Sequence, residues 1–155
     1  MLKIERIVRA DWTVIKLSGA LTEQGGVQLL HLYSETAPKC VFNLRDIVSI
    51  NSLGVRAWIM FLREFRVDRE VEIDECPSII VDQMNMLSNF TQKAAVRSVF
   101  VPMTCGGCNA RTDVLLNKRE FPKAGETVRP LRCKACGGSS TLDDDAYFDF
   151  LEHSA

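Results

Sequence analysis

Residues 40–65 read CVFNLRDIVSINSLGVRAWIMFLREF, and this stretch decides the class of fold. Its first five residues form a short apolar run, which is typical of a strand buried in the middle of a sheet. In its second half the apolar residues change to helical spacing, since Leu53, Ala57, Phe61 and Phe65 recur every four residues. A buried strand that leads into an amphipathic helix indicates an α/β domain.

The segments before this stretch continue the alternation of strands and helices. Residues 2–8 and 12–17 are rich in β-branched and apolar residues, and the break between them is short and polar, so we expect a hairpin. A helix capped by Thr22 should follow to about residue 35, although two glycines in its first turns weaken it by roughly 1 kcal/mol each.

The segments after it extend the pattern to about residue 103. We expect a strand at 71–74, a helix that starts near Pro77, and a last strand at 98–103 that runs into the first cysteine pair. The apolar stripe of the second helix should bury Ile80, Met84 and Leu87.

Length and charge limit the function classes. The chain has 155 residues, enough for one domain and a small second module. Its 19 Lys and Arg residues nearly balance 20 Asp and Glu residues, which argues against a globally basic binder of nucleic acid or membrane surfaces. We find no apolar run long enough for membrane insertion and no signal peptide, so we expect a cytoplasmic protein.

Four of the six cysteines have the spacing of a metal site. Two C-x2-C pairs, Cys105/Cys108 and Cys133/Cys136, are separated by residues 109–132. Such pairs suit one structural Zn²⁺ with four thiolate ligands, a closed sphere that leaves no position for substrate. A rubredoxin-like iron site and a redox dithiol at the first pair are the alternatives. Cys40 and Cys76 lie in or beside apolar runs and are expected in the core.

The cysteines belong to a module that we expect to be a zinc ribbon over residues 104–142. Residues 111–116 and 126–131 resemble the arms of a hairpin, with a possible third arm at 139–142. An acidic segment, 143–155, should close the chain as a short helix. The ribbon is locally basic, and one alternative function is nucleic-acid binding through Arg111, Lys118, Arg119 and Lys123.

Residues 42–55, FNLRDIVSINSLGV, resemble the signature of STAS domains, the family of bacterial anti-sigma-factor antagonists. The family has a strand with an Asp-Leu pair and then a loop ending in Asp-Ser-Ser-Gly that opens a helix. Asn43 and Asn51 stand here where the family usually has aspartates, and Leu53 replaces a small hydroxyl residue. The resemblance covers residues 1–103 and implies a mixed β-sheet with helices packed on one side.

The same resemblance implies a regulatory role without enzymatic activity. A partner kinase would phosphorylate Ser52, and the unmodified surface would bind a protein partner: a kinase, an anti-sigma factor or a signalling complex. The proposed partner surface comprises Asn51, Ser52, Gly54, Arg56, Arg63 and Arg66. Helical spacing places the three arginines on one face.

Alternatives to this role are a zinc-ribbon protein associated with transcription, and a STAS-like accessory subunit of a transporter or chemosensory complex. Catalysis is not expected, because the chain has only two histidines, His31 and His153, and no nucleophile paired with a base.

Overall fold

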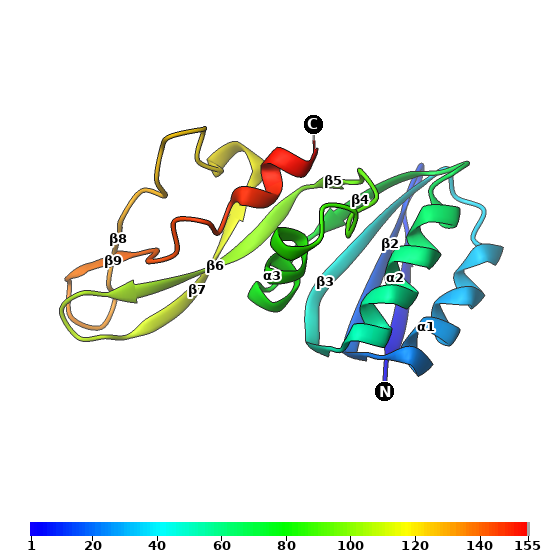
Figure 1. The fold of residues 1–155 in the computed structure, drawn as a ribbon, viewed down its shortest axis with the longest axis horizontal. Helices are drawn as coiled ribbons and strands as arrows, with labels where there is room; N and C mark the ends of the chain where they lie inside the picture. The colour runs from blue at the N-terminus through cyan, green and yellow to red at the C-terminus, as the bar shows by residue number, and fades with distance from the viewer. Residues whose placement is uncertain (155) are drawn as a thin grey trace.

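The computed structural model describes residues 1–154, except for the side chains of His153 and Ser154, and it contains two β-sheets. The side chain of His153, one of the two histidines, therefore lies outside the described part of the structure. The first sheet has the order β1-β2-β3-β4-β5 (Figure 1). Its strands are β1 (Lys3–Val8), β2 (Thr13–Leu21), β3 (Lys39–Ile50), β4 (Glu70–Asp74) and β5 (Ala95–Val96).

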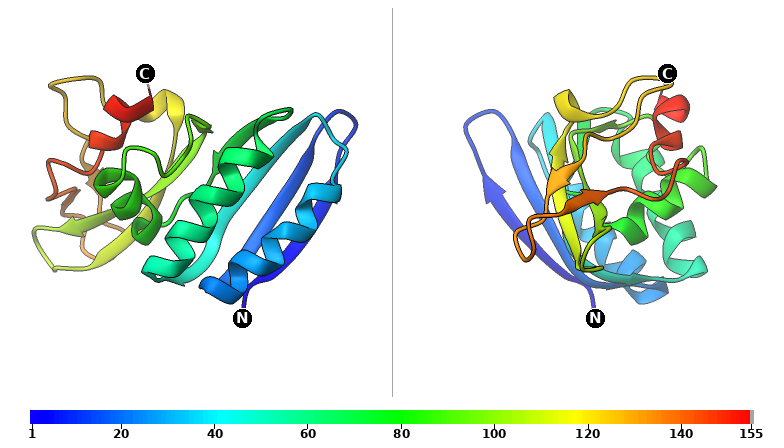
Figure 2. Two further views of the ribbon diagram at one scale, coloured as in Figure 1. Left: turned by 45° about the vertical axis from the view of Figure 1, so that its right-hand side comes forward. Right: turned by 90° about the vertical axis from the view of Figure 1, so that its left-hand side faces the viewer.

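The first sheet is mixed, as expected. β1 and β2 form the predicted antiparallel hairpin, and β2, β3, β4 and β5 are parallel neighbours. Two helices, α1 (Glu23–Leu29) and α2 (Ser52–Phe65), cover the same face of the sheet (Figure 2). After Leu29 the chain continues as a 3-10 helix, η1 (Leu30–Ser34), and Thr22 makes no side-chain capping bond.

The core lies between this face and α2. The register places Ile15, Phe42 and Ile73 side by side on neighbouring strands, and all three are fully buried. The ring of Phe42 meets the rings of Trp58 and Phe65 edge to face, with centroids 5.3 and 5.6 Å apart. Such pairs add about 0.5–1.5 kcal/mol beyond the area that they bury.

The glycines of α1 have a packing role that the sequence did not reveal. A Cβ on Gly26 would lie 2.3 Å from the Cβ of Ala57 on α2. Because real Cβ atoms do not approach so closely, only glycine lets the two helices pack at this distance.

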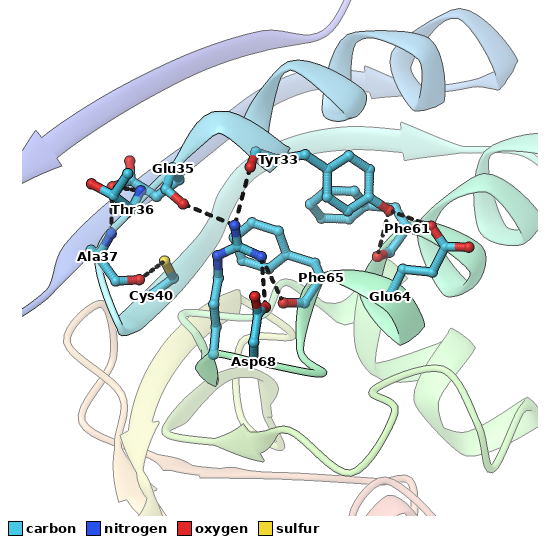
Figure 3. Close-up of polar contacts among 10 residues, drawn as sticks. Tyr33, Glu35, Thr36, Ala37, Cys40, Phe61, Glu64, Phe65 and Asp68 are labelled. Carbon is cyan, nitrogen blue, oxygen red and sulfur yellow. Dashed lines mark hydrogen bonds and ion pairs between the residues drawn. The ribbon is translucent and has the colours of Figure 1, made fainter.

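Polar contacts fix the connection between α1 and β3 (Figure 3). The Arg69 guanidinium donates to the backbone oxygens of Tyr33 and Glu35, at 3.1 and 2.8 Å, and stacks 4.3 Å from the Phe65 ring centroid. The buried Glu35 carboxylate accepts from Ala37 N at 3.0 Å and pairs with Arg6. These bonds join the end of α2 to the chain that enters β3.

The second sheet has the order β7-β6-β9-β8. Its strands are β6 (Ser98–Cys105), β7 (Arg111–Asn117), β8 (Leu131–Arg132) and β9 (Ser139–Thr141). Because β6 belongs to this sheet, the two sheets divide near Arg97 rather than at residue 103. Helix α3 (Ser78–Met86) lies between them and contacts β3 and β6 (Figure 1).

Two expectations about these segments are wrong. Residues 111–116 do not pair with 126–131: β7 pairs with β6, and most of 121–130 is irregular. The first cysteine pair turns the chain straight back on itself, so the strand before it is the nearest antiparallel partner. Leu87 is 37% exposed, because α3 ends at Met86 and the chain leaves the core there.

The C-terminal segment packs on α3 and ends in a 3-10 helix, η3 (Asp149–Ser154). The side-chain amide of Asn85 donates to Tyr147 O at 3.0 Å and accepts from Phe150 N at 2.7 Å. The Tyr147 hydroxyl donates to Phe100 O on β6. The segment is therefore bound to both α3 and the second sheet.

Candidate metal centre and partner surface

The four cysteines predicted as ligands come together at one end of the second sheet. The sulfur atoms of Cys105, Cys108, Cys133 and Cys136 all lie within 4.8 Å of one another. Cys105 ends β6, and Cys133 follows β8 directly. The pairing of β9 with both β6 and β8 brings the two strands, and so the two cysteine pairs, together.

The two C-x2-C turns have nearly the same geometry. In each, the residue after the second cysteine has a left-handed backbone: Asn109 has φ 60° and Gly137 has φ 77°. In each, that residue's N–H bonds the carbonyl of the first cysteine, at 3.0 and 2.9 Å. Glycine and asparagine are the residues that adopt this conformation most readily, and this is a sequence signal for a paired turn.

The turns also aim backbone N–H groups at the sulfurs. Gly107 N donates to Cys105 Sγ at 3.3 Å, and Gly138 N donates to Cys136 Sγ at 3.4 Å. Hydrogen bonds from the N–H groups of Cys108 and Gly107 lower the pKa of the Cys105 thiol to about 6. Hydrogen bonds from Cys136 and Ala135 lower the pKa of Cys133. The turns therefore favour the thiolate, the form that binds metal, at the first cysteine of each pair. At Cys136 the hydrogen bond from Gly138 N acts to lower the pKa, but the neighbouring cysteine sulfurs outweigh it and raise the pKa to about 11.

The sulfur separations fit a tetrahedral ion. Four sulfurs bound at about 2.3 Å to one ion lie about 3.8 Å apart at the corners of a tetrahedron. The Cys105–Cys136 and Cys108–Cys133 sulfurs are 3.4 and 3.7 Å apart, far longer than the roughly 2.05 Å of a disulfide bond. The four residues could therefore hold one metal ion.

The space beside the cysteine sulfurs is so small that only a glycine fits there. A Cβ on Gly138 would lie 3.1 Å from Cys105 Sγ and 3.2 Å from Cys136 Sγ. Either contact would push a ligand sulfur from its place. The sequence could not predict the contact with Cys105, because that residue belongs to the other cysteine pair, which is distant in sequence.

The residues predicted as a partner surface lie along α2. Asn51, Ser52 and Arg56 are exposed at the start of the helix, and Arg63 is exposed near its end. Arg66 follows the last turn and is half-buried. Within residues 1–154, neither the Ser52 hydroxyl nor the guanidinium groups of Arg56, Arg63 and Arg66 form a hydrogen bond or an ion pair that would occupy them.

Unlike Ser52, both Asn51 and Gly54 have a structural role. The Asn51 side chain accepts from Gly54 N at 2.8 Å and caps α2. Asn51, rather than Ser52, is therefore the cap of α2. Gly54 is buried, and a Cβ on it would lie 1.9 Å from Leu21 O, at the end of β2. Only glycine lets the first turn of α2 approach the end of β2 so closely.

The remaining cysteines are core residues. Cys40 and Cys76 are fully buried, and burial raises the pKa of Cys40 to about 11, so both thiols stay protonated near neutral pH. His31 is exposed on η1. Among the described residues, no helix combines the length and the apolar character needed to cross a bilayer.

Comparisons with known proteins do not extend this description. No protein-family model matches the chain, and no curated protein matches it. The interpretation of the partner surface therefore rests on the residues themselves.

Proposed function

We propose that the chain is a non-enzymatic bacterial regulatory protein whose first sheet is a STAS-like docking domain of the anti-sigma-factor-antagonist type. Its partner would be a protein in the cytoplasm: a kinase, an anti-sigma factor or a signalling complex. The observation that carries this proposal is the exposed, unbonded Ser52 hydroxyl in the first turn of α2. Since Asn51 caps the helix, the Ser52 hydroxyl is free to meet a partner.

Phosphorylation of Ser52 would change this surface by charge. A phosphate carries nearly two negative charges at neutral pH, and the first turn of a helix favours negative charge. Arg56 lies one helical turn after Ser52, a spacing at which side chains meet. The phosphate would therefore neutralise a cation that the unmodified surface offers to an acidic partner.

Binding of a partner tests the proposal. Ser52→Asp and Arg56→Glu variants of the full chain, used as bait in a lysate of the native host, should lose proteins that the unchanged chain retains. Arg9→Glu is the matched control, because Arg9 is equally exposed but lies beyond the end of β1. Mass spectrometry of the retained proteins separates a kinase or anti-sigma factor from a transporter or chemosensory subunit. Equal retention by all four baits would refute the proposed surface.

We assign the four-cysteine cluster to one structural Zn²⁺. The four thiolates close the coordination sphere, so the ion would fold the second sheet and take no part in chemistry. The redox alternative fits less well, because Cys105 and Cys108 lie in a turn between two strands rather than at the start of a helix.

Metal analysis of the purified chain tests this assignment. One zinc per chain is expected, with a colourless protein. Cys108→Ser should reduce the metal content, whereas Cys40→Ser, at a buried cysteine outside the cluster, should leave the zinc content of the folded fraction unchanged. A red protein with one iron per chain would instead establish the rubredoxin-like site, and intact disulfides without metal would refute both.

A further inference from the structure

Basic residues gather around the second cysteine turn. Between residues 109 and 135 all seven Lys and Arg side chains are exposed, against three acidic ones. Arg129, Arg132 and Lys134 belong to this set and lie directly before or within the turn, and we call them the turn cations. Strand β8, which includes Arg132, lies with β9 at the end of the molecule that is far from α1 and α2 (Figure 1).

The structure gives the turn cations no partner among the described residues. Within residues 1–154 none of the three forms an ion pair or a side-chain hydrogen bond. In the first sheet, by contrast, Arg6, Arg45 and Arg97 each pair with a carboxylate. Cations left without a partner can bind external anions without first breaking an internal bond.

Other basic residues of the ribbon are closer to negative charge. Lys118 and Arg119 line a cleft with Glu72 and Asp74 of β4. Lys123 lines another with acidic residues of the C-terminal segment, among them Asp144, Asp145 and Asp149. The structure therefore favours the turn cations over these three residues, which sequence reasoning had named.

The second cysteine turn limits the positions of the turn cations. The Arg132 guanidinium lies 3.6 Å from the place where a Cβ on Gly137 would be, so it packs against the turn. Arg111 on β7 adds a fourth cation to this end of the sheet and is paired at 3.9 Å with Asp113. A divalent ion bound by four thiolates has a net charge of −2. The three turn cations and Arg111 carry four positive charges, more than this site.

Aromatic residues of this module are not available to stack on bases. Tyr147 and Phe150 are buried, and Phe121 packs against Phe148 with ring centroids 5.3 Å apart. Proteins that bind single strands usually combine basic residues with aromatic platforms. Cations without aromatic platforms are suited to bind the phosphate groups of a duplex. Contacts to phosphates do not depend on the base sequence.

We infer that the turn cations, with Arg111, bind the phosphate backbone of double-stranded DNA without reading its sequence. Three to four phosphate contacts make binding strongly dependent on salt. With a slope of about −0.9 per contact, the association constant should fall about 40- to 150-fold between 50 and 200 mM salt. This surface is separate from α2, so the inference does not depend on the proposed partner surface.

Fluorescence anisotropy of the full, metal-loaded chain with a labelled 20-base-pair duplex of random sequence provides the test. The triple variant Arg129→Gln, Arg132→Gln, Lys134→Gln should bind more weakly, and its salt slope should be smaller by about 2.7. The matched control is Lys3→Gln, Arg9→Gln, Lys93→Gln, which removes the same charge from exposed positions outside both proposed surfaces and should leave the slope unchanged. Metal content and circular dichroism verify that each variant is folded.

Several results would overturn the inference. They are undetectable binding at 50 mM salt, equal losses in the two triple variants, or tighter binding to a single strand than to the duplex. If the turn variant loses its metal, the double variant Arg129→Gln, Lys134→Gln keeps the Arg132 contact and should lower the slope by about 1.8. An unchanged slope in that folded variant would also overturn the inference.

Discussion

Asn51 and Ser52 are neighbours at the start of α2, yet the structure uses them differently. Both residue types are good helix caps, so the sequence alone does not decide which of them caps α2. The choice depends on where β3 ends, and β3 continues to Ile50, six residues beyond the expected end. Past Asn43 the strand has β2 but no longer β4 beside it, so polar residues are tolerated and the apolar signal disappears.

This assignment predicts opposite outcomes for two adjacent alanine substitutions. Asn51→Ala should lower the free energy of unfolding by about 1 kcal/mol, because it removes the bond to Gly54 N. Ser52→Ala should change it by less than about 0.5 kcal/mol, as is usual for exposed positions without contacts. Urea unfolding of the two variants measures both values, and equal losses would contradict the assignment.

Glu35 should make the stability of the fold depend on pH. Burial acts to raise its pKa, but the hydrogen bonds from Ala37 N and Arg6 outweigh that effect, so the pKa is lowered. Because the pKa of Glu35 in the folded state is below the unfolded value of about 4.5, the ionised carboxylate stabilises the fold at pH values above 4.5. This contribution is lost as the pH falls through the folded-state pKa. Glu35→Gln should therefore be less stable at pH 7 and lose less stability on acidification to pH 3. Parallel pH profiles of thermal midpoint for the variant and the unchanged chain would exclude this role.

Local patterns predicted the elements of the first sheet well. The β1–β2 hairpin, α2 and the start of α3 each follow from apolar spacing within one short segment. The second sheet was predicted less well, because β8 and β9 have only two and three residues and few apolar side chains. These short strands and the two cysteine turns come together through contacts between segments distant in sequence, which no local pattern predicts.

Metal removal should accordingly affect the second sheet first. β8 is bound to β9 at only two residue positions, and β9 to β6 at two. Binding energy on the order of 10 kcal/mol for a structural zinc ion is large beside that of so few backbone hydrogen bonds. Hydrogen–deuterium exchange after treatment with a chelator should rise in residues 131–141 while β3 and α2 stay protected. Uniform exchange throughout the chain would show instead that the ion stabilises both sheets equally.

Considered as one molecule, the protein joins its two sheets through α3, β6 and the C-terminal segment. At the junction Ser98 at the start of β6 bonds Asp74, and Asn43 and Arg45 bond Glu75. The Ser98–Asp74 bond joins a strand of one sheet to a strand of the other, and all three contacts link residues distant in sequence, so no local pattern could predict them. The same is true of Asn85, a half-buried amide on α3 that looks like an ordinary surface residue.

Asn85→Ala should release the C-terminal segment from α3. Two hydrogen bonds, to Tyr147 O and from Phe150 N, would be lost, and each is worth about 1 kcal/mol. Limited proteolysis should then cut residues 143–152 faster than in the unchanged chain. Gln83→Ala is the matched control, because it removes an amide from the same helix at a position without such bonds. Equal cleavage of the two variants would show that the amide does not hold the segment.

Strand β6 sets the distance between the core beside α3 and the cysteine cluster. Its Val99 is sealed into the core beside α3, while its last residue, Cys105, is one of the four clustered cysteines. A continuous strand of eight residues spans about 25 Å at roughly 3.3 Å per residue, and β7 pairs with it from Ser98 to Thr104, joined by β9 on the other edge at Thr104 and Cys105. Objects attached at the two ends of β6, beside α3 and at the cysteines, would therefore be held about the length of this strand apart.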